Sequence, residues 1–211
     1  MNFSEKTAVV TGGSRGLGRA ICLELARGGA NVVLCYAGNE AAANETVAAC
    51  ESLGAKAVAI RCDVSKEDEV KALMDAALKT FGRIDILVNN AGFGISGAVE
   101  FTDTADAKAL FDVNFFGLVN MNRAVVPLLR QAGRGRIVNL SSVAAPVPIP
   151  FQAYYSATKA AVNAYTMALA NELRPFGVTV CAVMPGDIHT GFTAARRKIG
   201  EGDDIYQGRI G

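Results

Sequence analysis

A tyrosine and a lysine lie four residues apart at Tyr155 and Lys159, within the run Tyr-Ser-Ala-Thr-Lys. This spacing places both side chains on the same face of a helix, one turn apart. A tyrosine hydroxyl has an ordinary pKa of about 10 and is a poor acid or base at neutral pH, but a nearby ammonium favours the phenolate and lowers that pKa. The pair therefore predicts proton transfer to or from a substrate oxygen, although an ordinary helical pair has the same spacing.

Several other chemistries are excluded by residue counts. His189 is the single histidine, so neither a Ser-His-Asp triad nor a histidine metal site can be assembled. There are five cysteines and none is spaced as Cys-x-x-Cys, which argues against a disulfide framework or a zinc site. We therefore expect no metal. Cys35 and Cys181 lie in apolar runs, where small buried side chains are expected.

A glycine-rich turn follows the first apolar run. Residues 12–18 read Gly-Gly-Ser-Arg-Gly-Leu-Gly and lead directly into a stretch with helical spacing. In such a turn the pyrophosphate of a dinucleotide binds backbone N–H groups at the helix N-terminus, and a Cβ would hold the phosphates away. The spacing Gly-x-x-x-Gly-x-Gly differs from the commoner Gly-x-Gly-x-x-Gly, but its place after the first strand is the required context. The predicted phosphate-binding residues are Gly12, Ser14, Arg15, Gly16, Leu17 and Gly18.

The second apolar run ends in Tyr36 and Ala37, where an acidic residue would bind the ribose 2′-hydroxyl of NAD. The nearest acid is Glu40, so no carboxylate is placed to repel a 2′-phosphate. Arg15 can reach that phosphate with a guanidinium that suits its geometry, or it can simply point to solvent. We therefore expect NADP(H) in preference to NAD(H). Asp63, after the third run, is expected to accept from the adenine amino group or to serve as a strand-end turn acid.

The elements that position these residues alternate between two periods. Continuous apolar runs predict strands buried on both faces, at residues 7–11, 31–36, 56–61, 84–89, 136–140 and 178–184. Helical spacing is found at residues 16–28, 40–53, 66–81, 102–131 and 152–175. The alternation predicts an α/β fold, with a doubly wound parallel sheet between two layers of helices, as one domain over residues 1–211. After His189 the periodicity fades, and residues 193–198 are the last that could be helical.

Polar and glycine residues follow two further predicted strands. Asn89, Asn90, Ala91 and Gly92 come after the fourth run, and the pair at 141–142 is Ser-Ser after the fifth. The carboxyl ends of parallel strands meet at one edge of a sheet, where such folds bind ligands. We expect these residues to gather there with the glycine loop.

Composition sets the remaining limits. The chain has 211 residues, 51% apolar and 19% charged, which is typical of a globular protein and not of a disordered one. Its 21 basic and 20 acidic residues nearly cancel, which argues against nucleic acid or a polybasic membrane surface as the main partner. No apolar stretch approaches the roughly 18 residues of a membrane span, and residues 1–6 do not resemble a signal peptide. We therefore expect a cytoplasmic protein.

Jointly, the motifs resemble those of the short-chain dehydrogenase/reductase family in its compact, single-domain form. The matching pieces span the chain in the family's order: TGGSRGLG (11–18), CDV (62–64), NNAG (89–92), VN (113–114), SS (141–142), YSATK (155–159) and PGDIHT (185–190). The resemblance implies an oxidoreductase that interconverts a ketone and a secondary alcohol by hydride transfer from a nicotinamide cofactor.

The resemblance also implies a role for each matching residue. Tyr155 would be the proton donor in ketone reduction, and Lys159 would bind the nicotinamide ribose and lower the pKa of Tyr155. Ser142 would hydrogen-bond the substrate carbonyl. Asn114 would hold a water chain to the lysine, or else is a polar residue that bonds a kinked helix. Dinucleotide contacts are implied for Asp63, Val64, Asn90, Ala91, Gly92, Tyr155, Lys159, Pro185, Gly186, Ile188 and Thr190.

The sequence departs from the family pattern in two places. Residues 143–151 are almost wholly apolar and contain three prolines, which with Phe93 and Ile95 predicts a rigid apolar wall for the substrate, or else plain packing. Family members usually continue with a helix and a final edge strand. This chain stops at Gly211 with neither, so we expect the last strand to be missing from the sheet.

Two alternative functions and the state of assembly remain. A non-catalytic dinucleotide-binding regulator would commonly lose the tyrosine or the lysine, and a sugar-nucleotide epimerase would need other glycine spacing and a large C-terminal domain. The substrate could be a 3-oxoacyl thioester, a steroid or a small aliphatic ketone.

Residues 102–131 and 152–175 are too apolar for helices with one buried face, so we expect a homodimer, or a homotetramer in a longer form.

Overall fold

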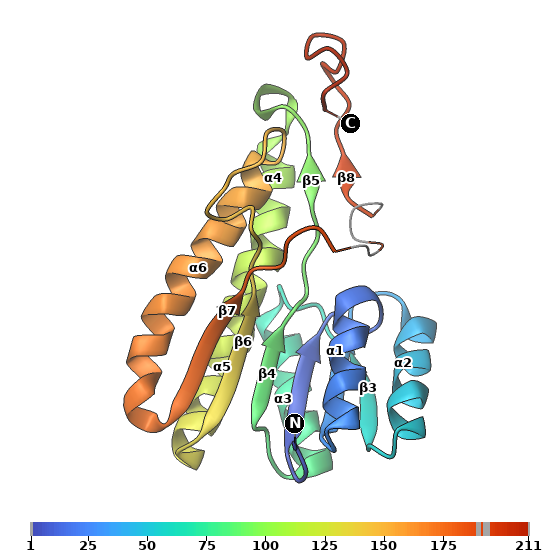
Figure 1. Cartoon of the computed structure of the whole chain (residues 1–211), viewed down its shortest axis with the longest axis vertical. Helices are drawn as coiled ribbons and strands as arrows, with labels where there is room; N and C mark the ends of the chain where they lie inside the picture. Colours follow the sequence, from blue (N-terminus) through green and yellow to red (C-terminus); the bar gives the residue numbers. More distant parts are fainter. Residues whose placement is uncertain (1, 189–190, 192–194, 211) are drawn as a thin grey trace.

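Six parallel strands form the central sheet of the computed structural model, which describes residues 2–188, 191 and 195–210 (Figure 1). The strands lie in the order β3-β2-β1-β4-β6-β7. Their bounds are β1 Thr7–Thr11, β2 Asn31–Tyr36, β3 Ala57–Arg61, β4 Ile86–Asn89, β6 Gly135–Leu140 and β7 Val178–Val183. The chain winds outward from β1 through β2 to β3 and then returns to the other side of β1 with β4. This reversal is the switch point of a doubly wound sheet, and the predicted fold class is confirmed.

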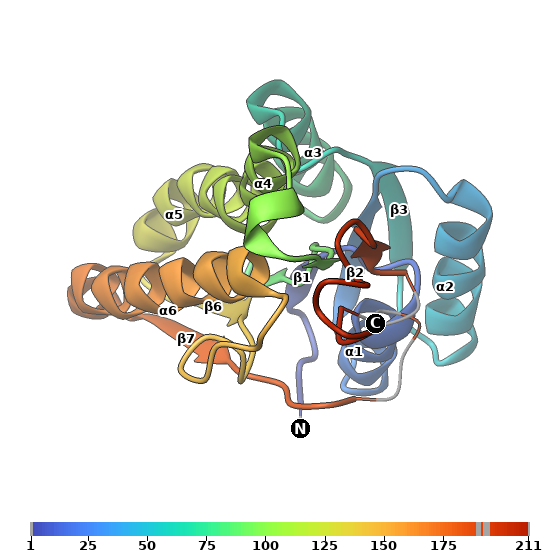
Figure 2. The same cartoon turned by 90° about the horizontal axis from the view of Figure 1, so that it is seen from above.

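Helices cover the sheet on two sides (Figure 2). On one side lie α1 (Gly16–Arg27) and α2 (Glu40–Ser52). The other side carries α3 (Glu67–Phe81), α4 (Thr104–Phe111), α5 (Leu118–Ala132) and α6 (Ala153–Leu173). The short elements are the second small sheet of β5 (Ile95–Ser96) and β8 (Arg197–Lys198), the 3₁₀ turns η1 (Val99–Phe101) and η3 (Arg174–Phe176), and the π-helical segment η2 (Asp112–Gly117).

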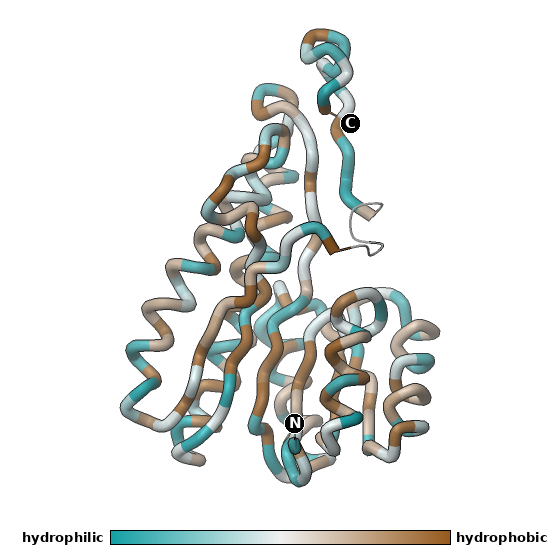
Figure 3. Tube along the Cα trace, in the orientation of Figure 1, coloured by the Kyte–Doolittle hydropathy of each residue, from teal (hydrophilic) through white to brown (hydrophobic). Residues whose placement is uncertain are grey.

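The apolar runs of the sequence become two cores, one on each face of the sheet. Val9, Val33 and Leu87 belong to the core under α3 and α5, whereas Val10 and Leu34 belong to the core under α1 and α2. Neighbouring residues of one strand thus point into different cores, which is why the runs are continuous and not alternating. The hydropathy trace shows the same pattern, with apolar residues concentrated along the strands (Figure 3).

The strand at the edge of the sheet corrects one expectation. Cys35 in β2 is buried as predicted, but Cys181 in β7 is exposed. Val178 and Val180 of β7 are buried on the face that α6 covers. Thr179 and Cys181 point to the other face, where α1 and α2 lie over more distant strands and no helix of the described residues covers β7 (Figure 2). Among the described residues β7 is also an edge strand of the sheet.

Two predicted helices are wrong in part. The helix expected over residues 102–131 is divided into α4 and α5 by the π-helical segment η2, since its hydrogen bonds change register around Asn114. In the segment 193–198, the described residues Arg197 and Lys198 form a strand that pairs with β5. That pairing joins residues about a hundred positions apart, so the local periodicity of the sequence does not predict this strand.

Candidate active site

The predicted site residues meet at the carboxyl edge of the sheet, which is uppermost in Figure 1 and faces the viewer in Figure 2. The glycine loop follows β1, Asn90 follows β4, and Ser142 follows β6. Tyr155 and Lys159 lie in the first two turns of α6. Parallel strands bring these segments together because their carboxyl ends share one edge, and the β1–β4 switch point opens a crevice between them.

The glycine loop has the close backbone approaches that exclude side chains. Gly12 and Gly16 have φ of +63° and +54°, a region that favours glycine. A Cβ at Gly18 would overlap the carbonyl oxygen of Gly12 and lie 2.6 Å from Asn90 Nδ2. The N-cap residue of α1, Arg15, makes no capping hydrogen bond with its side chain, so the first N–H groups of the helix remain for a ligand. These residues fit the pyrophosphate of a dinucleotide.

Gly13 is a structural member of this loop that sequence reasoning did not separate from the others. A Cβ at Gly13 would lie 2.6 Å from the Cβ of Leu34 and 3.0 Å from the sulfur of Cys22. Its backbone N–H donates to the carbonyl of Cys35 at 3.1 Å. Gly13 therefore faces the core between β1, β2 and α1, and its small size allows the loop to sit against the sheet.

Asn90 and Thr11 join the loop to the neighbouring strand. Thr11 Oγ1 accepts from the backbone N–H groups of Asn90 and Ala91, each at 2.9 Å. In return, Asn90 Nδ2 donates to the carbonyls of Thr11 at 2.9 Å and Gly12 at 3.2 Å. The predicted cofactor residue Asn90 thus shapes the loop. Thr11 was missed; its only signal is a hydroxyl at the end of an apolar strand.

Asp63 has the local role of a turn acid. Its Oδ1 accepts from the N–H and the hydroxyl of Ser65, at 3.0 and 2.7 Å. The neighbouring residue Val64 is buried against Gly117, and its carbonyl accepts from Asn120 at 3.1 Å. Contacts of Asp63 and Val64 with a cofactor therefore stay a prediction.

Two arginines lie near strand ends on this edge, Arg15 in the loop after β1 and Arg61 at the end of β3. Arg15 is exposed at the start of α1. Arg61, which pairs with Tyr36 in the sheet, donates from Nε to the carbonyl of Ala37 at 3.3 Å. Sequence reasoning named Arg15 but missed Arg61, because only the β2–β3 register places residue 61 beside residue 36.

The catalytic candidates form a compact group. Ser142 is hydrogen-bonded through its hydroxyl to Tyr155, and its Oγ accepts from the N–H of Ala144 at 3.1 Å. The ammonium of Lys159 donates to the carbonyl of Leu140 at 2.7 Å and lies 5.7 Å from the centre of the Tyr155 ring. Tyr155 and Lys159 are both buried. Sequence spacing thus predicted a group that the fold brings into contact.

The hydroxyl of Ser141 completes the attachment of this helix. Ser141 is buried, and its Oγ donates to the carbonyl of Lys159 at 3.1 Å. Together with the Lys159 ammonium on Leu140, this bond fixes the second turn of α6 to the end of β6. The first serine of the Ser-Ser pair positions the helix, and the second faces Tyr155.

The pKa values of the pair correct one expectation. Burial raises the pKa of Tyr155, and the hydrogen bond from Ser142 and the positive charge of Arg196 offset only part of that rise. Burial also lowers the pKa of Lys159 to about 8. A depression of the Tyr155 pKa by the Lys159 ammonium is therefore not found in this structure. Burial dominates the pKa of Tyr155 and leaves the tyrosine in its protonated form at neutral pH.

Asn114 lies in the π-helical segment and is buried. Its Oδ1 accepts from the N–H of Phe93 at 3.0 Å, and its Nδ2 donates to the carbonyl of Phe93 at 2.9 Å and to Thr158 Oγ1 at 3.4 Å. A Cβ at Gly92 would lie 2.9 Å from Asn114 Oδ1. The side chain thus joins the Asn-Asn-Ala-Gly loop to the helices, a role that sequence reasoning did not name, and a water chain remains a prediction.

The segment after β7 follows the same edge. The carbonyl of Pro185 accepts from the N–H of Val143 at 3.1 Å, and Gly186 and Ile188 are exposed. Thr190, for which a cofactor contact was predicted, lies outside the described residues.

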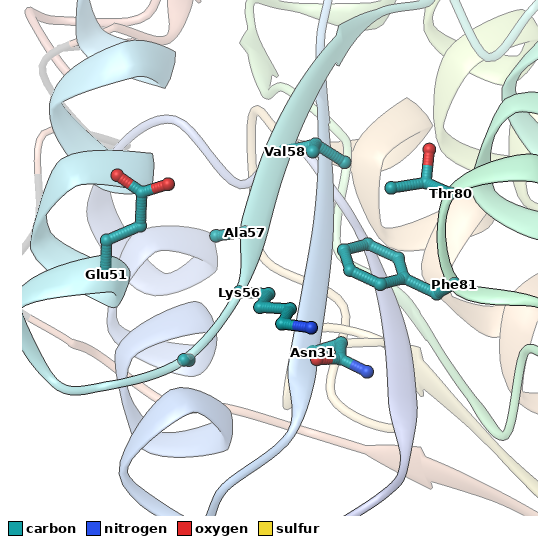
Figure 4. A pocket seen from close by; sticks show the side chains of 8 residues that line it. Asn31, Glu51, Lys56, Ala57, Val58, Thr80 and Phe81 are labelled. Carbon is teal, nitrogen blue, oxygen red and sulfur yellow. The ribbon is translucent and has the colours of Figure 1, made fainter.

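A separate hollow of about 440 Å³ lies at the opposite edge of the sheet (Figure 4). It is lined by Asn31, Glu51, Ala55, Lys56, Ala57, Val58, Thr80 and Phe81. These residues lie at the amino ends of strands or the carboxyl ends of helices, away from the phosphate loop. Across the ranges that the structure describes, no three His, Cys, Asp or Glu side chains gather as a metal site would need, and no helix is long and apolar enough to cross a bilayer.

Comparison with known proteins agrees with this geometry. The family model for short chain dehydrogenases matches residues 6–199. A 3-oxoacyl-[acyl-carrier-protein] reductase of Synechocystis is 42% identical over 191 residues, which are 90% of this chain and 77% of that protein. A 3-ketoacyl-(acyl-carrier-protein) reductase of Brucella melitensis, solved with NADH, superposes with a TM-score of 0.87 at 34% identity, covering 92% of this chain and 81% of the other.

Xylitol dehydrogenase, solved with NAD⁺, superposes with a TM-score of 0.85 at 32% identity, covering 88% of this chain and 72% of that one. The chain belongs to the short-chain dehydrogenase/reductase family. It is an NAD(P)-dependent oxidoreductase of the class that acts on CH–OH and C=O groups.

The crowded position of Gly18 can be tested directly. Gly18→Ala should lower the free energy of unfolding by about 1–3 kcal/mol, as overpacking usually does, and weaken dinucleotide binding because the loop must shift away from Asn90. Thermal unfolding and titration of NADPH fluorescence measure the two effects. Gly200→Ala is the control, since nothing lies within 4 Å of a Cβ there. A folded Gly18→Ala protein with unchanged affinity would contradict the assignment of the loop.

Proposed function

We propose that this protein interconverts a ketone and a secondary alcohol with NADP(H), and that Tyr155 is the proton donor and acceptor. The observation that carries the proposal is the group of Ser142, Tyr155 and Lys159 at the carboxyl edge of the sheet, next to a glycine loop that fits a dinucleotide. The glycine loop and the N-terminus of α1 would hold the pyrophosphate. The bound dinucleotide supplies the hydride.

The residues of the chain handle the oxygen and its proton. Ser142 and Tyr155 present two hydroxyls to one substrate oxygen, which fixes the carbonyl and stabilises the negative charge that develops on it. Tyr155 then donates its proton to that oxygen. The raised pKa of Tyr155 suits this direction, because a proton donor must be protonated before the reaction. Lys159, held by Leu140, keeps a positive charge close to the phenolate that remains.

Removal of the Tyr155 hydroxyl tests the proton donor. Tyr155→Phe should lower kcat by about 10²–10⁴-fold, the usual contribution of general acid–base catalysis, while the dissociation constant of the dinucleotide is unchanged. Steady-state kinetics with a panel of ketones, and fluorescence titration of NADPH, measure the two quantities. Tyr165→Phe removes a hydroxyl further along α6, outside this group, and should keep its kcat. Near-full turnover by Tyr155→Phe would show that another group supplies the proton.

The preference for NADP(H) is supported by charges at the end of β2. Arg15 is exposed beside the loop, and Arg61 is hydrogen-bonded to the carbonyl of Ala37. No acidic residue occupies positions 36–39. The side chain of Asn39 is used as the N-cap of α2, where it accepts from the N–H of Ala42 at 3.0 Å. A 2′-phosphate would therefore meet cations and no carboxylate.

The cofactor preference has a quantitative test. Arg15→Ala should lower kcat/KM for NADPH roughly ten- to hundredfold, because it removes charge-assisted hydrogen bonding worth about 1.5–3 kcal/mol. The kcat/KM for NADH should stay nearly unchanged. Arg27→Ala, at the other end of α1, is the matched control, because Arg27 is exposed and pairs with Glu24. Equal use of NADH and NADPH by the unaltered protein would refute this preference.

The substrate site is proposed to be largely apolar. Tyr155 packs with Ile95, Leu110 and Ala144, and the partly buried Phe93, Tyr154 and Ile199 lie against this cluster. The proline-containing loop continues the apolar surface outward, since Val143, Val147 and Ile149 are all exposed. Exposure of this loop favours a substrate wall over plain packing.

A homodimer is proposed from the outer surface of α6. Met167 is 65% exposed, and Ala160, Ala164 and Ala168 on the same face are exposed as well. Phe116, in the π-helical segment, is also half exposed. Small side chains along one face allow a second helix to approach closely, and a second copy would cover these apolar groups.

Sedimentation at micromolar concentration measures the assembly. The expected mass is at least twice the 22.0 kDa of one chain. Met167→Glu, which places a charge in the proposed contact, should shift the protein toward the monomer, while Lys79→Glu on α3 should not. A monomer for the unaltered chain would mean that these helices need no partner.

A further inference from the structure

A short strand, β8, returns beside the candidate active site, and Arg196, the residue before it, forms no ion pair among the described residues. β8 pairs in parallel with β5, with Arg197 opposite Ile95 and Lys198 opposite Ser96 (Figure 1). The pairing is completed by Arg197 N–H to Gly94 at 2.9 Å and Ile199 N–H to Ser96 at 2.8 Å. Because Ile95 packs against Tyr155, this return strand lies beside the catalytic candidates.

The return strand is fastened at several points. Arg197 pairs with Asp106 of α4 at 2.5 Å, and Asp106 is mostly buried. Beyond the strand, Tyr206 donates its hydroxyl to Glu100 at 2.6 Å and stacks edge-on against Phe151. These contacts define the position of Arg196, which directly precedes β8.

Arg196 is placed differently from its neighbour. It is partly buried, and its Nε is fully buried without a hydrogen-bond partner among the described residues. It forms no ion pair within that part of the chain, whereas Arg197 beside it has Asp106. Its charge is felt by the Tyr155 hydroxyl, whose pKa it lowers against the larger effect of burial. A buried donor on a cation is costly to leave unpaired, so this position indicates an anionic partner that the described residues do not supply.

We propose that Arg196 binds a carboxylate of the substrate, so that the natural substrate is an oxo acid whose carbonyl meets Ser142 and Tyr155 while its carboxylate meets the guanidinium. The Nε and an adjacent Nη of arginine form a planar pair of donors that matches a carboxylate. The apolar cluster around Tyr155 then contacts the carbon skeleton. This inference rests on the proposed ketone reduction and names its substrate class.

Matched acids and esters test the inference. The probes are 2-oxo-, 3-oxo- and 4-oxopentanoate and their methyl esters, which differ mainly in the negative charge. The unaltered protein should reduce at least one acid with a higher kcat/KM than its ester. Arg196→Gln should lower kcat/KM for that acid by about ten- to hundredfold and leave the ester nearly unchanged. Lys198→Gln, two residues away and exposed, should change neither.

A binding measurement separates this inference from the proposed function. Equilibrium dialysis of pentanoate against the NADPH-bound protein should show retention that Arg196→Gln loses and Tyr155→Phe keeps. Equal retention by the unaltered and Arg196→Gln proteins overturns the carboxylate site, whatever the turnover. Reduction of esters and ketones with no preference for acids also overturns it and leaves the proposed function standing. Retention of pentanoate without reduction of any probe keeps the site and removes the proposed function.

Discussion

The hydrogen bonds between Thr11 and Asn90 hold together the two strand ends on which the site depends. They cross the switch point, where β1 and β4 lie side by side but their following segments turn to opposite faces of the sheet. Thr11 Oγ1 accepts from two backbone N–H groups, and Asn90 Nδ2 donates to two backbone carbonyls. These bonds satisfy backbone groups that the diverging chains would otherwise leave unpaired. The phosphate loop on one side and the Asn114-bound loop on the other both start from this junction, so its geometry sets the crevice for a dinucleotide.

Burial governs the chemistry of the group on α6. It keeps the Tyr155 hydroxyl protonated and reduces the affinity of Lys159 for its proton. The protein offsets the cost of a buried ammonium with a backbone carbonyl, that of Leu140, and not with a carboxylate. An acidic partner would neutralise the lysine, whereas a carbonyl satisfies one N–H and leaves the charge available to a nearby anion.

Much of the fold and of the site could be predicted from local patterns. Continuous apolar runs located all six strands of the main sheet. Strands between two helical layers, such as β1 and β2, bury nearly every residue. The Tyr155–Lys159 spacing and the glycine loop were recognisable since each motif is contiguous in sequence. What could not be predicted depends on distant neighbours. Arg61 lies near the end of β2 only because the β2–β3 register pairs it with Tyr36. The strand β8 forms only by pairing with β5. The exposure of Cys181 arises because no described element covers that side of β7, and the residues of β7 do not encode this locally.

The exposed sulfur on β7 makes the uncovered face of the sheet chemically addressable. Four of the five cysteines are buried in the cores, and Cys181 alone is exposed. A thiol-reactive fluorophore would therefore attach to the folded chain at one position, in the middle of the outermost strand. Its emission and its rate of attachment would report whether anything comes to rest on that face, and unfolding would be visible as the sudden reactivity of the other four thiols.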